Sequence, residues 1–198
     1  MNLVELHSSV MEELETFVVA GVLPALKGAS DGAVRDVLDT DNSYYYQWLA
    51  CLMRVLKPQR VVELGGAMGV SAIVMLESLP AESKLYSITL PENGLEFSYI
   101  KTEYPNLIKV VANDRDINVW PKDLDWGKTD VLFVDAEHTK DEVQRELDTY
   151  LPLIGPGRLV IMDDIKLNPG MWEVWLGLDK NKLDVSELHH SGFGIFES

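Results

Sequence analysis

The chain alternates between short apolar runs and segments with helical spacing, and this alternation predicts most of its secondary structure. Short apolar runs without polar alternation are typical of strands buried on both faces of a parallel sheet. Such runs occupy residues 60–64, 84–89, 106–111, 130–135 and 158–163. Apolar residues at helical spacing predict helices at 3–20, 44–57, 70–79, 92–103, 139–151 and 169–177.

Strands that alternate with helices indicate a doubly wound α/β fold, with helices on both faces of a mostly parallel sheet. The end of the chain differs, because KLDVSELHHSGFGIFE predicts two strands joined by a turn at Ser191-Gly192. This antiparallel hairpin would complete a seven-stranded sheet. We predict one domain over residues 44–198, preceded by a helical segment at 1–43 that caps the cleft or forms an interface, such as that of a homodimer.

Charge and composition restrict the partners of the chain. Its 198 residues include 17 Lys and Arg against 32 Asp and Glu, a formal net charge of −15. Nucleic acid is a poor partner for such a chain, because phosphate binding needs a basic surface. Cys51 is the only cysteine, and its apolar neighbours predict a core position. We expect a cytoplasmic location and no membrane contact, because FVVAGVLPAL at 17–26 is too short to span a bilayer.

The stretch VVELGGAMGVSAIVML at 61–76 predicts a strand, a glycine turn and the start of a helix. A phosphate-binding loop would need a lysine directly after Gly69, where Val70 stands. A dinucleotide fingerprint would need glycine at Ala67 and at Val70. Both of these phosphate-binding chemistries are therefore excluded.

The remaining pattern places Glu63 before Gly65 and Gly66, and Ser71 after Gly69. The acid favours an ammonium group, whereas a serine at a helix start suits a carboxylate. A nucleoside that carries an amino acid, as S-adenosylmethionine does, has both groups. The alternative is a glycine turn that only packs the strand against the helix.

Three acids lie at the carboxyl ends of predicted strands, at Asp135 and at Asp163-Asp164. Carboxylates that converge on one sheet edge repel each other unless a cation or protons intervene. Hard oxygen ligands select Mg²⁺, Ca²⁺ or Mn²⁺, which would lower the pKa of a substrate hydroxyl. The alternative is that Asp163 or Asp164 caps a helix and the others are solvated.

His138 follows Asp135 closely and is a candidate general base. We expect His189 and His190 to be surface or turn residues. Five aromatic residues could line an acceptor pocket or cover the sheet. They are Tyr44, Tyr45, Tyr46, Trp172 and Trp175. For the three tyrosines, a core or interface position is favoured.

Three motifs together resemble the class I S-adenosylmethionine-dependent methyltransferases, above all the metal-dependent O-methyltransferases of catechols and sugars. They are VVELGGAMGVSAIVM, DVLFVDAEHTKDEV and LIGPGRLVIMDDI, and the resemblance covers residues 44 to the end. It implies a Rossmann-like fold and a methionine end held by the first motif. It also implies a metal-ligand aspartate followed by a base in the second motif, and an acidic pair in the third.

The resemblance has one clear departure. Family members usually end the second strand with an acid that holds the ribose hydroxyls, but Thr89 stands there and Glu92 follows. Either Glu92 turns back toward the ribose or the cofactor binds more weakly. The resemblance further implies that Asp114 and Arg115 contact the adenine, and that Asp135 contributes to both the cofactor site and the metal site.

The sequence therefore predicts an S-adenosylmethionine-dependent O-methyltransferase that uses Mg²⁺, or Ca²⁺ or Mn²⁺, and acts on a small hydroxylated molecule. Two alternatives remain, a hydroxylase-like tailoring enzyme on the same scaffold and a non-catalytic module that binds a nucleoside or a partner enzyme. We also expect a bulky residue at Gly65 to block cofactor binding while the fold largely survives.

Overall fold

The computed structural model describes residues 1–19, 44–100 and 103–198. Most of the N-terminal segment predicted at 1–43 therefore lies outside the described residues, and its assignment as a cap or interface stays a prediction. Within the described ranges, no helix combines the length and the apolar character needed to cross a bilayer.

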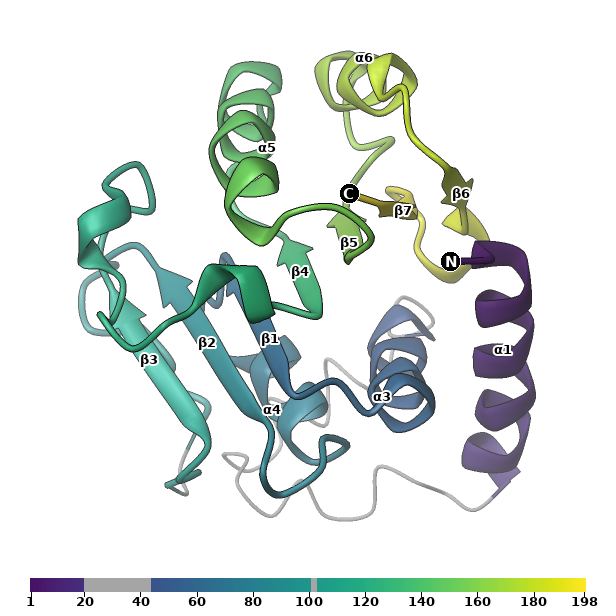
Figure 1. Cartoon of the computed structure of the whole chain (residues 1–198), viewed down its shortest axis with the longest axis horizontal. Helices are drawn as coiled ribbons and strands as arrows, with labels where there is room; N and C mark the ends of the chain where they lie inside the picture. Colours follow the sequence, from purple (N-terminus) through teal and green to yellow (C-terminus); the bar gives the residue numbers. More distant parts are fainter. Residues whose placement is uncertain (20–43, 101–102) are drawn as a thin grey trace.

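A seven-stranded sheet forms the centre of the molecule (Figure 1), with the strand order β3-β2-β1-β4-β5-β7-β6. The first five strands pair in parallel, whereas β7 pairs antiparallel with both β5 and β6. The strands are β1 (Arg60–Leu64), β2 (Lys84–Thr89), β3 (Leu107–Val111), β4 (Val131–Val134), β5 (Leu159–Asp163), β6 (Lys182–Asp184) and β7 (Phe193–Glu197). The predicted doubly wound, Rossmann-like fold with its C-terminal hairpin is confirmed.

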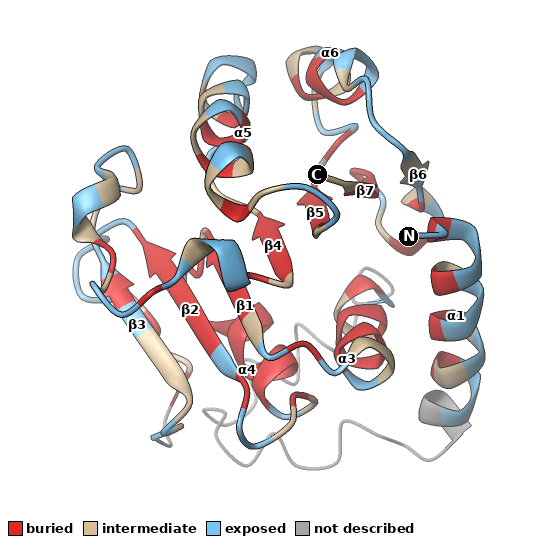
Figure 2. Cartoon of the chain, in the orientation of Figure 1, coloured by how far each residue is buried: buried red, intermediate tan, exposed pale blue. Residues whose placement is uncertain are grey.

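Helices cover both faces of the sheet, which explains why the parallel strands are apolar throughout (Figure 2). One buried cluster joins the sheet to α1 (Leu3–Val19), α3 (Tyr44–Leu56) and α4 (Val70–Leu76). The other joins it to α5 (Lys140–Ile154) and α6 (Pro169–Gly177). Neighbouring strand residues alternate between the clusters, so that Val61 faces the first and Val62 the second.

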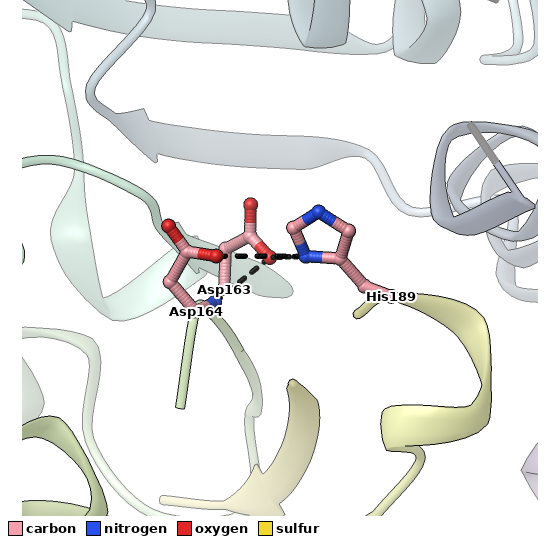
Figure 3. Close-up of side chains that lie close together, drawn as sticks. All are labelled: Asp163, Asp164 and His189. Atoms are coloured by element: carbon pink, nitrogen blue, oxygen red, sulfur yellow. Dashed lines mark hydrogen bonds and ion pairs between the residues drawn. The ribbon is translucent and has the colours of Figure 1, made fainter. Parts of the chain in front are cut away.

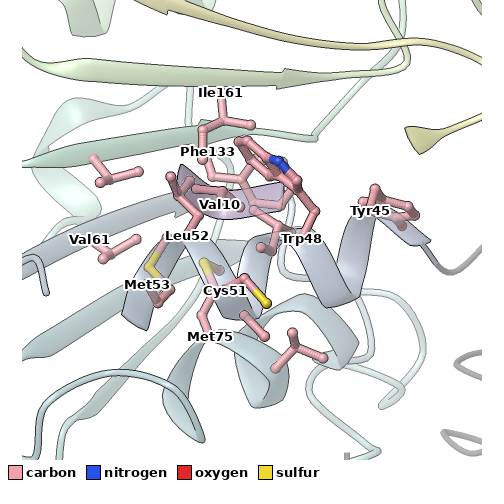
Figure 4. Close-up of a cluster of buried hydrophobic side chains, with 14 of the residues drawn as sticks. Val10, Tyr45, Trp48, Cys51, Leu52, Met53, Val61, Met75, Phe133 and Ile161 are labelled. Atoms are coloured by element: carbon pink, nitrogen blue, oxygen red, sulfur yellow. The ribbon is translucent and has the colours of Figure 1, made fainter. Parts of the chain in front are cut away.

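The first cluster is built around α3 (Figure 4). Trp48, Cys51 and Leu52 of this helix are fully buried, as is Val10 of α1. The prediction of a core position for Cys51 is therefore confirmed. The Trp48 indole also donates a hydrogen bond of 3.2 Å to His7 Nδ1, which ties α1 to α3.

The helix predicted at 92–103 is wrong over the described residues 92–100, which form turns. Asn93, Gly94 and Phe97 have positive φ angles of 57°, 82° and 53°, so the backbone cannot continue as a right-handed helix. Phe97 and Ile100 instead pack against the glycine turn after β1. The remaining regular pieces are short 3₁₀ helices, η1 (Ile117–Val119), η2 (Trp126–Lys128) and η3 (Ser186–Leu188).

Candidate functional site

A cavity of about 380 Å³ opens at the carboxyl ends of β1, β2, β3 and β4. Strand order reverses between β1 and β4, and such switch points are where open α/β sheets bind ligands. The lining residues come from the loops after these strands and from α5. They are Gly65, Ala67, Ile88, Thr89, Leu90, Glu92, Ala112, Asn113, Asp114, Arg115, Asp135, Ala136, Glu137, Glu142 and Glu146.

Gly65 lines this cavity, and its neighbours surround it closely. Its φ of +98° lies in the left-handed region, and its N–H donates a 3.0 Å hydrogen bond to the Ile88 carbonyl. A Cβ atom on Gly65 would lie 1.7 Å from the Asp135 carbonyl oxygen. The expectation that a bulky residue here would spare the fold is therefore wrong, because protein backbone already fills that space.

Among the residues predicted to hold the methionine end, Gly65 lines the cavity, whereas Glu63, Gly66, Gly69 and Ser71 do not. Glu63 is fully buried and accepts hydrogen bonds from the hydroxyls of Ser71 and Ser87. Burial raises the pKa of Glu63, while the two serine hydrogen bonds oppose the shift. Gly66 packs against Ser87, and Gly69 has no room for a larger residue beside Ile100. These residues shape the turn, and their contact with a cofactor stays a prediction.

The adenine-contacting residues predicted after β3 do line the cavity. Asp114 Oδ2 accepts a 2.8 Å hydrogen bond from Arg145, and its carbonyl accepts one of 2.7 Å from the Tyr150 hydroxyl. Arg115 forms an ion pair with Glu142 of α5. This end of the cavity is therefore a network of charges that fastens the loop after β3 to α5.

Thr89 and Glu92, the residues that replace the usual ribose-binding acid, both line the cavity. Thr89 is mostly buried and its hydroxyl donates a long 3.4 Å hydrogen bond to the Leu90 carbonyl. The placement of Glu92 on the lining is compatible with a carboxylate that turns back toward the ribose.

Glu146 also lines the cavity, and the sequence analysis missed it. It is only 1% exposed. Burial, followed by the neighbouring Asp114 carboxylate, raises its pKa to about 8. One signal could have found it, because Glu146 falls on the apolar face of α5 between the buried Val143 and Leu147. An acid inside such a stripe needs a partner or a ligand.

A cluster of polar side chains lies beside the cavity, beyond the end of β5 (Figure 3). Asp163, Asp164 and His189 each offer a ligand atom within 4.8 Å of the others. His189 Nδ1 is 3.0 Å from Asp163 Oδ1 and 3.6 Å from Asp164 Oδ1. The Ser191 hydroxyl donates to Asp164. His189 begins the turn that was expected here, because its carbonyl accepts a 2.9 Å hydrogen bond from the Gly192 N–H, but its side chain is directed to the acidic pair, whereas His190 is exposed as expected.

His138 connects this cluster to the cavity. Its Nε2 lies 3.3 Å from Asp135 Oδ1 and 3.3 Å from Asp164 Oδ2. The three predicted metal ligands are thus neighbours, but the His138 imidazole lies between the carboxylates of Asp135 and Asp164. Asn168 holds the loop in place, because its side chain donates a 2.9 Å hydrogen bond to the His138 carbonyl.

The carboxylates around the two histidines favour the charged form of each imidazole. The hydrogen bond to Asp135 is the main cause that raises the pKa of His138. Burial is the largest single effect at His189 and opposes its charged form, but the hydrogen bond to Asp163 and the charges of Asp163 and Asp164 together outweigh burial, so the pKa of His189 is also raised. Burial raises the pKa of Asp135 and of Asp163, and the Asp163 charge raises that of Asp135 further.

The acidic pair does not cap the following helix. Asn168 is the N-cap of α6 and accepts a 3.1 Å hydrogen bond from the Met171 N–H. Two of the nearby aromatic residues, Tyr45 and Trp175, occupy core positions. Trp175 is buried and covers the sheet beside Phe196, whereas Tyr45 is buried with its ring 4.4 Å from that of His189.

The sheet order, the glycine turn after β1 and the cavity at the switch point together define the class I S-adenosylmethionine-dependent methyltransferase fold. A family model described as a methyltransferase domain matches residues 62–165, which is more than half of the chain. The chain belongs to this methyltransferase family.

Solved structures with the same fold include several O-methyltransferases. TomG of Streptomyces achromogenes, described as an O-methyltransferase involved in tomaymycin synthesis and in complex with S-adenosylmethionine, is 18% identical. Its match has a TM-score of 0.62 and covers 86% of this chain and 90% of that one. A putative caffeoyl-CoA O-methyltransferase of Staphylococcus aureus is 14% identical, with a TM-score of 0.65 and coverage of 85% and 93%. At such identities these matches show the fold alone.

One relative by sequence is the uncharacterized protein y4gI of Sinorhizobium fredii (strain NBRC 101917 / NGR234). It is 19% identical over 161 residues, which are 73% of this chain. The chain spans only 18% of the length of that much longer relative.

Proposed function

We propose that the chain is an S-adenosylmethionine-dependent O-methyltransferase that uses a divalent cation and acts on a small hydroxylated molecule. The observation that carries the proposal is the position of Asp135. It lines the cavity at the switch point and also lies 3.3 Å from His138, whose imidazole reaches Asp164. A pocket for the methyl donor and a site for the hydroxyl would therefore share one wall.

The donor set beside the cavity fits a cation. Asp163 and Asp164 supply the oxygen ligands that Mg²⁺, Ca²⁺ and Mn²⁺ prefer, and the His189 imidazole favours Mn²⁺ among these three. These three residues would hold the ion, with Asp135 next to them across His138. When bound, the cation would lower the pKa of a substrate hydroxyl and fix its position.

His138 is the proposed proton acceptor. Its Nε2 lies within 3.3 Å of two carboxylates, and these would stabilise the imidazolium that forms when it takes the hydroxyl proton. Asn168 fixes the loop that carries it, through the hydrogen bond to its carbonyl. His138 therefore combines a defined position with the charge partners that a general base needs.

Transfer of a labelled methyl group from S-adenosylmethionine into a metabolite extract tests this proposal. Label should appear in small molecules with Mg²⁺ or Mn²⁺, disappear with excess chelator, and return when the cation is restored. Full transfer in excess chelator would contradict the cation role. Calorimetric titration of the cofactor should give the same affinity with and without chelator, because the cavity and the acid cluster serve different ligands.

Variants of the cluster separate its parts. Asp163→Asn and Asp164→Asn should each lose most of the transfer, and the double variant should lose little more, because both act on one ion. His138→Ala should lower turnover by about 10²–10⁴-fold and leave cofactor affinity unchanged. Asp148→Asn, a change at an exposed acid of α5, should behave like the wild type. Cofactor binding without any transfer would favour the non-catalytic module instead.

A further inference from the structure

The segment after β2 contains the only asparagine of the chain that is followed directly by a glycine, Asn93-Gly94. The Leu95 N–H donates a 3.2 Å hydrogen bond to the Glu92 carbonyl and closes a turn around this pair. Asn93 and Gly94 have positive φ angles of 57° and 82°, which is the pattern of a type I′ turn. Both residues are exposed. The Asn-Gly bond therefore lies at the tip of an exposed turn.

The groups of this pair are weakly held. The Asn93 side chain makes no hydrogen bond with any residue that the structure describes. The Gly94 N–H donates a long hydrogen bond of 3.4 Å to Glu96 Oε1. Apart from its chain neighbours, no atom of the described residues lies within 4 Å of a Cβ position at Gly94. The Gly94 nitrogen is therefore accessible to the Asn93 side chain.

An asparagine next to an accessible glycine nitrogen can lose its amide without an enzyme. The Gly94 nitrogen attacks Cγ of Asn93, a C–N bond forms, the Cγ–Nδ2 bond breaks, and ammonia leaves with the proton of the Gly94 N–H. Water then opens the resulting succinimide at either of its carbonyl groups, which gives aspartate or isoaspartate. Glycine favours the attack because it has no side chain beside the nitrogen. The reaction consumes only water.

Either product would change the wall of the cavity. Glu92 lines the cavity, and each product places a new negative charge next to it in the chain. Isoaspartate also adds a methylene group to the backbone inside the turn that Leu95 and Glu92 close. We infer that Asn93 is a site of spontaneous deamidation and that its conversion weakens ligand binding in the cavity beside Glu92. The second part of this inference rests on the proposed function, whereas the first part does not.

Peptide mapping by mass spectrometry tests the first part on folded wild-type protein that is aged in warm, mildly alkaline buffer. The peptide with Asn93 should gain about 1 Da as the amide becomes a carboxyl group, and its product should include isoaspartate. Asn118 is an internal control, because it is exposed as well, donates a 2.9 Å hydrogen bond to Asp116 Oδ1 and precedes the β-branched Val119. Its peptide should keep its mass over the same time.

This comparison needs no variant, so it does not depend on how well a substituted chain folds. Gly94→Ala should slow the mass gain at Asn93, because the new side chain crowds the attacking nitrogen. Equal gains at Asn93 and Asn118 would overturn the modification site. A gain at Asn93 that appears only after unfolding in urea would overturn it as well, because the folded turn would then prevent the reaction.

Calorimetric titration with S-adenosylhomocysteine tests the second part. Aged wild-type protein should lose binding in proportion to the converted fraction. Aged and fresh Asn93→Gln should bind alike, because the longer side chain closes the corresponding ring far less readily. Unchanged binding by converted wild-type protein would overturn the effect on the cavity and leave the modification site intact. No binding by fresh wild-type protein would overturn the second part together with the proposed function.

Discussion

At the scale of single residues, two buried glutamates show how partners decide the role of a charge. Glu63 accepts hydrogen bonds from the hydroxyls of Ser71 and Ser87, and so links β1 to α4 and β2. Glu146 has the acids Asp114 and Glu142 as neighbours, and it lines the cavity. The hydroxyl donors offset part of the burial effect on the pKa of Glu63, whereas the acid neighbours add to the burial effect at Glu146 and raise its pKa to about 8.

Gly65→Ala should strongly destabilise the protein. The new Cβ would lie 1.7 Å from the Asp135 carbonyl oxygen, and the φ of +98° disfavours any side chain. We expect a loss of more than about 3 kcal/mol in the free energy of unfolding, measured by urea denaturation, because a backbone clash adds to the φ strain.

Two other glycines serve as controls for this substitution. Gly94 has a φ of +82° and open space around its Cβ position, so Gly94→Ala should cost only about 1–2 kcal/mol. Gly177, the last residue of α6, has open space and no positive φ, so alanine there should be neutral or stabilising by up to about 1 kcal/mol. Equal losses at Gly65 and Gly94 would show that the close contact is unimportant.

At the scale of elements, the end of β5 explains how two consecutive acids reach one histidine. Neighbouring residues of a strand point to opposite faces, so Asp163 and Asp164 would diverge if the strand continued. The strand ends at Asp163, and Asp164 takes a positive φ of 56°. Its N–H donates a 2.8 Å hydrogen bond to Asp163 Oδ1, and both carboxylates lie beside His189.

The packing of α1 on α3 is a second property of elements, and Leu14→Ala tests it. Leu14 is 2% exposed in the core cluster shared by the two helices. Its truncation should lower the free energy of unfolding by about 2–5 kcal/mol, measured by denaturant titration. Val4 on the same helix is 60% exposed, and Val4→Ala should change stability by at most about 0.5 kcal/mol. Indistinguishable results would mean that α1 folds apart from the domain.

At the scale of the whole molecule, buried acids make stability depend on pH. The pKa of Glu146 rises from 4.5 to about 8 on folding, and that of Glu63 is also raised. Between pH 4.5 and 8 the folded state therefore holds protons that the unfolded state has released. Stability should be highest near the lower limit and fall as the pH rises, by about 1.4 kcal/mol per pH unit for each such group.

Glu146→Gln isolates the contribution of that residue. Urea unfolding at several pH values between 5 and 8 should give a shallower loss of stability in this variant than in the wild type, so that the curves diverge toward high pH. Asp148→Asn removes an exposed charge and should leave the slope unchanged. Parallel wild-type and Glu146→Gln curves would contradict a buried neutral Glu146. The formal net charge of −15 lowers stability in both proteins alike.

The sequence by itself determined the sheet and the edge where ligands gather. Apolar runs need cover on both faces, so the strands at 60–64, 84–89 and 158–163 could be located with their helices. Parallel strands also place their carboxyl ends together, which brought the glycine turn, Asp135 and Asp163-Asp164 to one edge. These properties depend on local patterns and on chain direction, and both are visible in a single sequence.

Only the tertiary structure decided which side chains complete the site. His189 is 26 residues from Asp163 and reaches it because β7 inserts between β5 and β6. Glu146 meets Asp114 because α5 packs beside the loop after β3, and residues 92–100 form turns because Phe97 and Ile100 pack on the glycine turn. Contacts between distant segments depend on how the elements pack together, and no local pattern of apolar and polar residues encodes that packing.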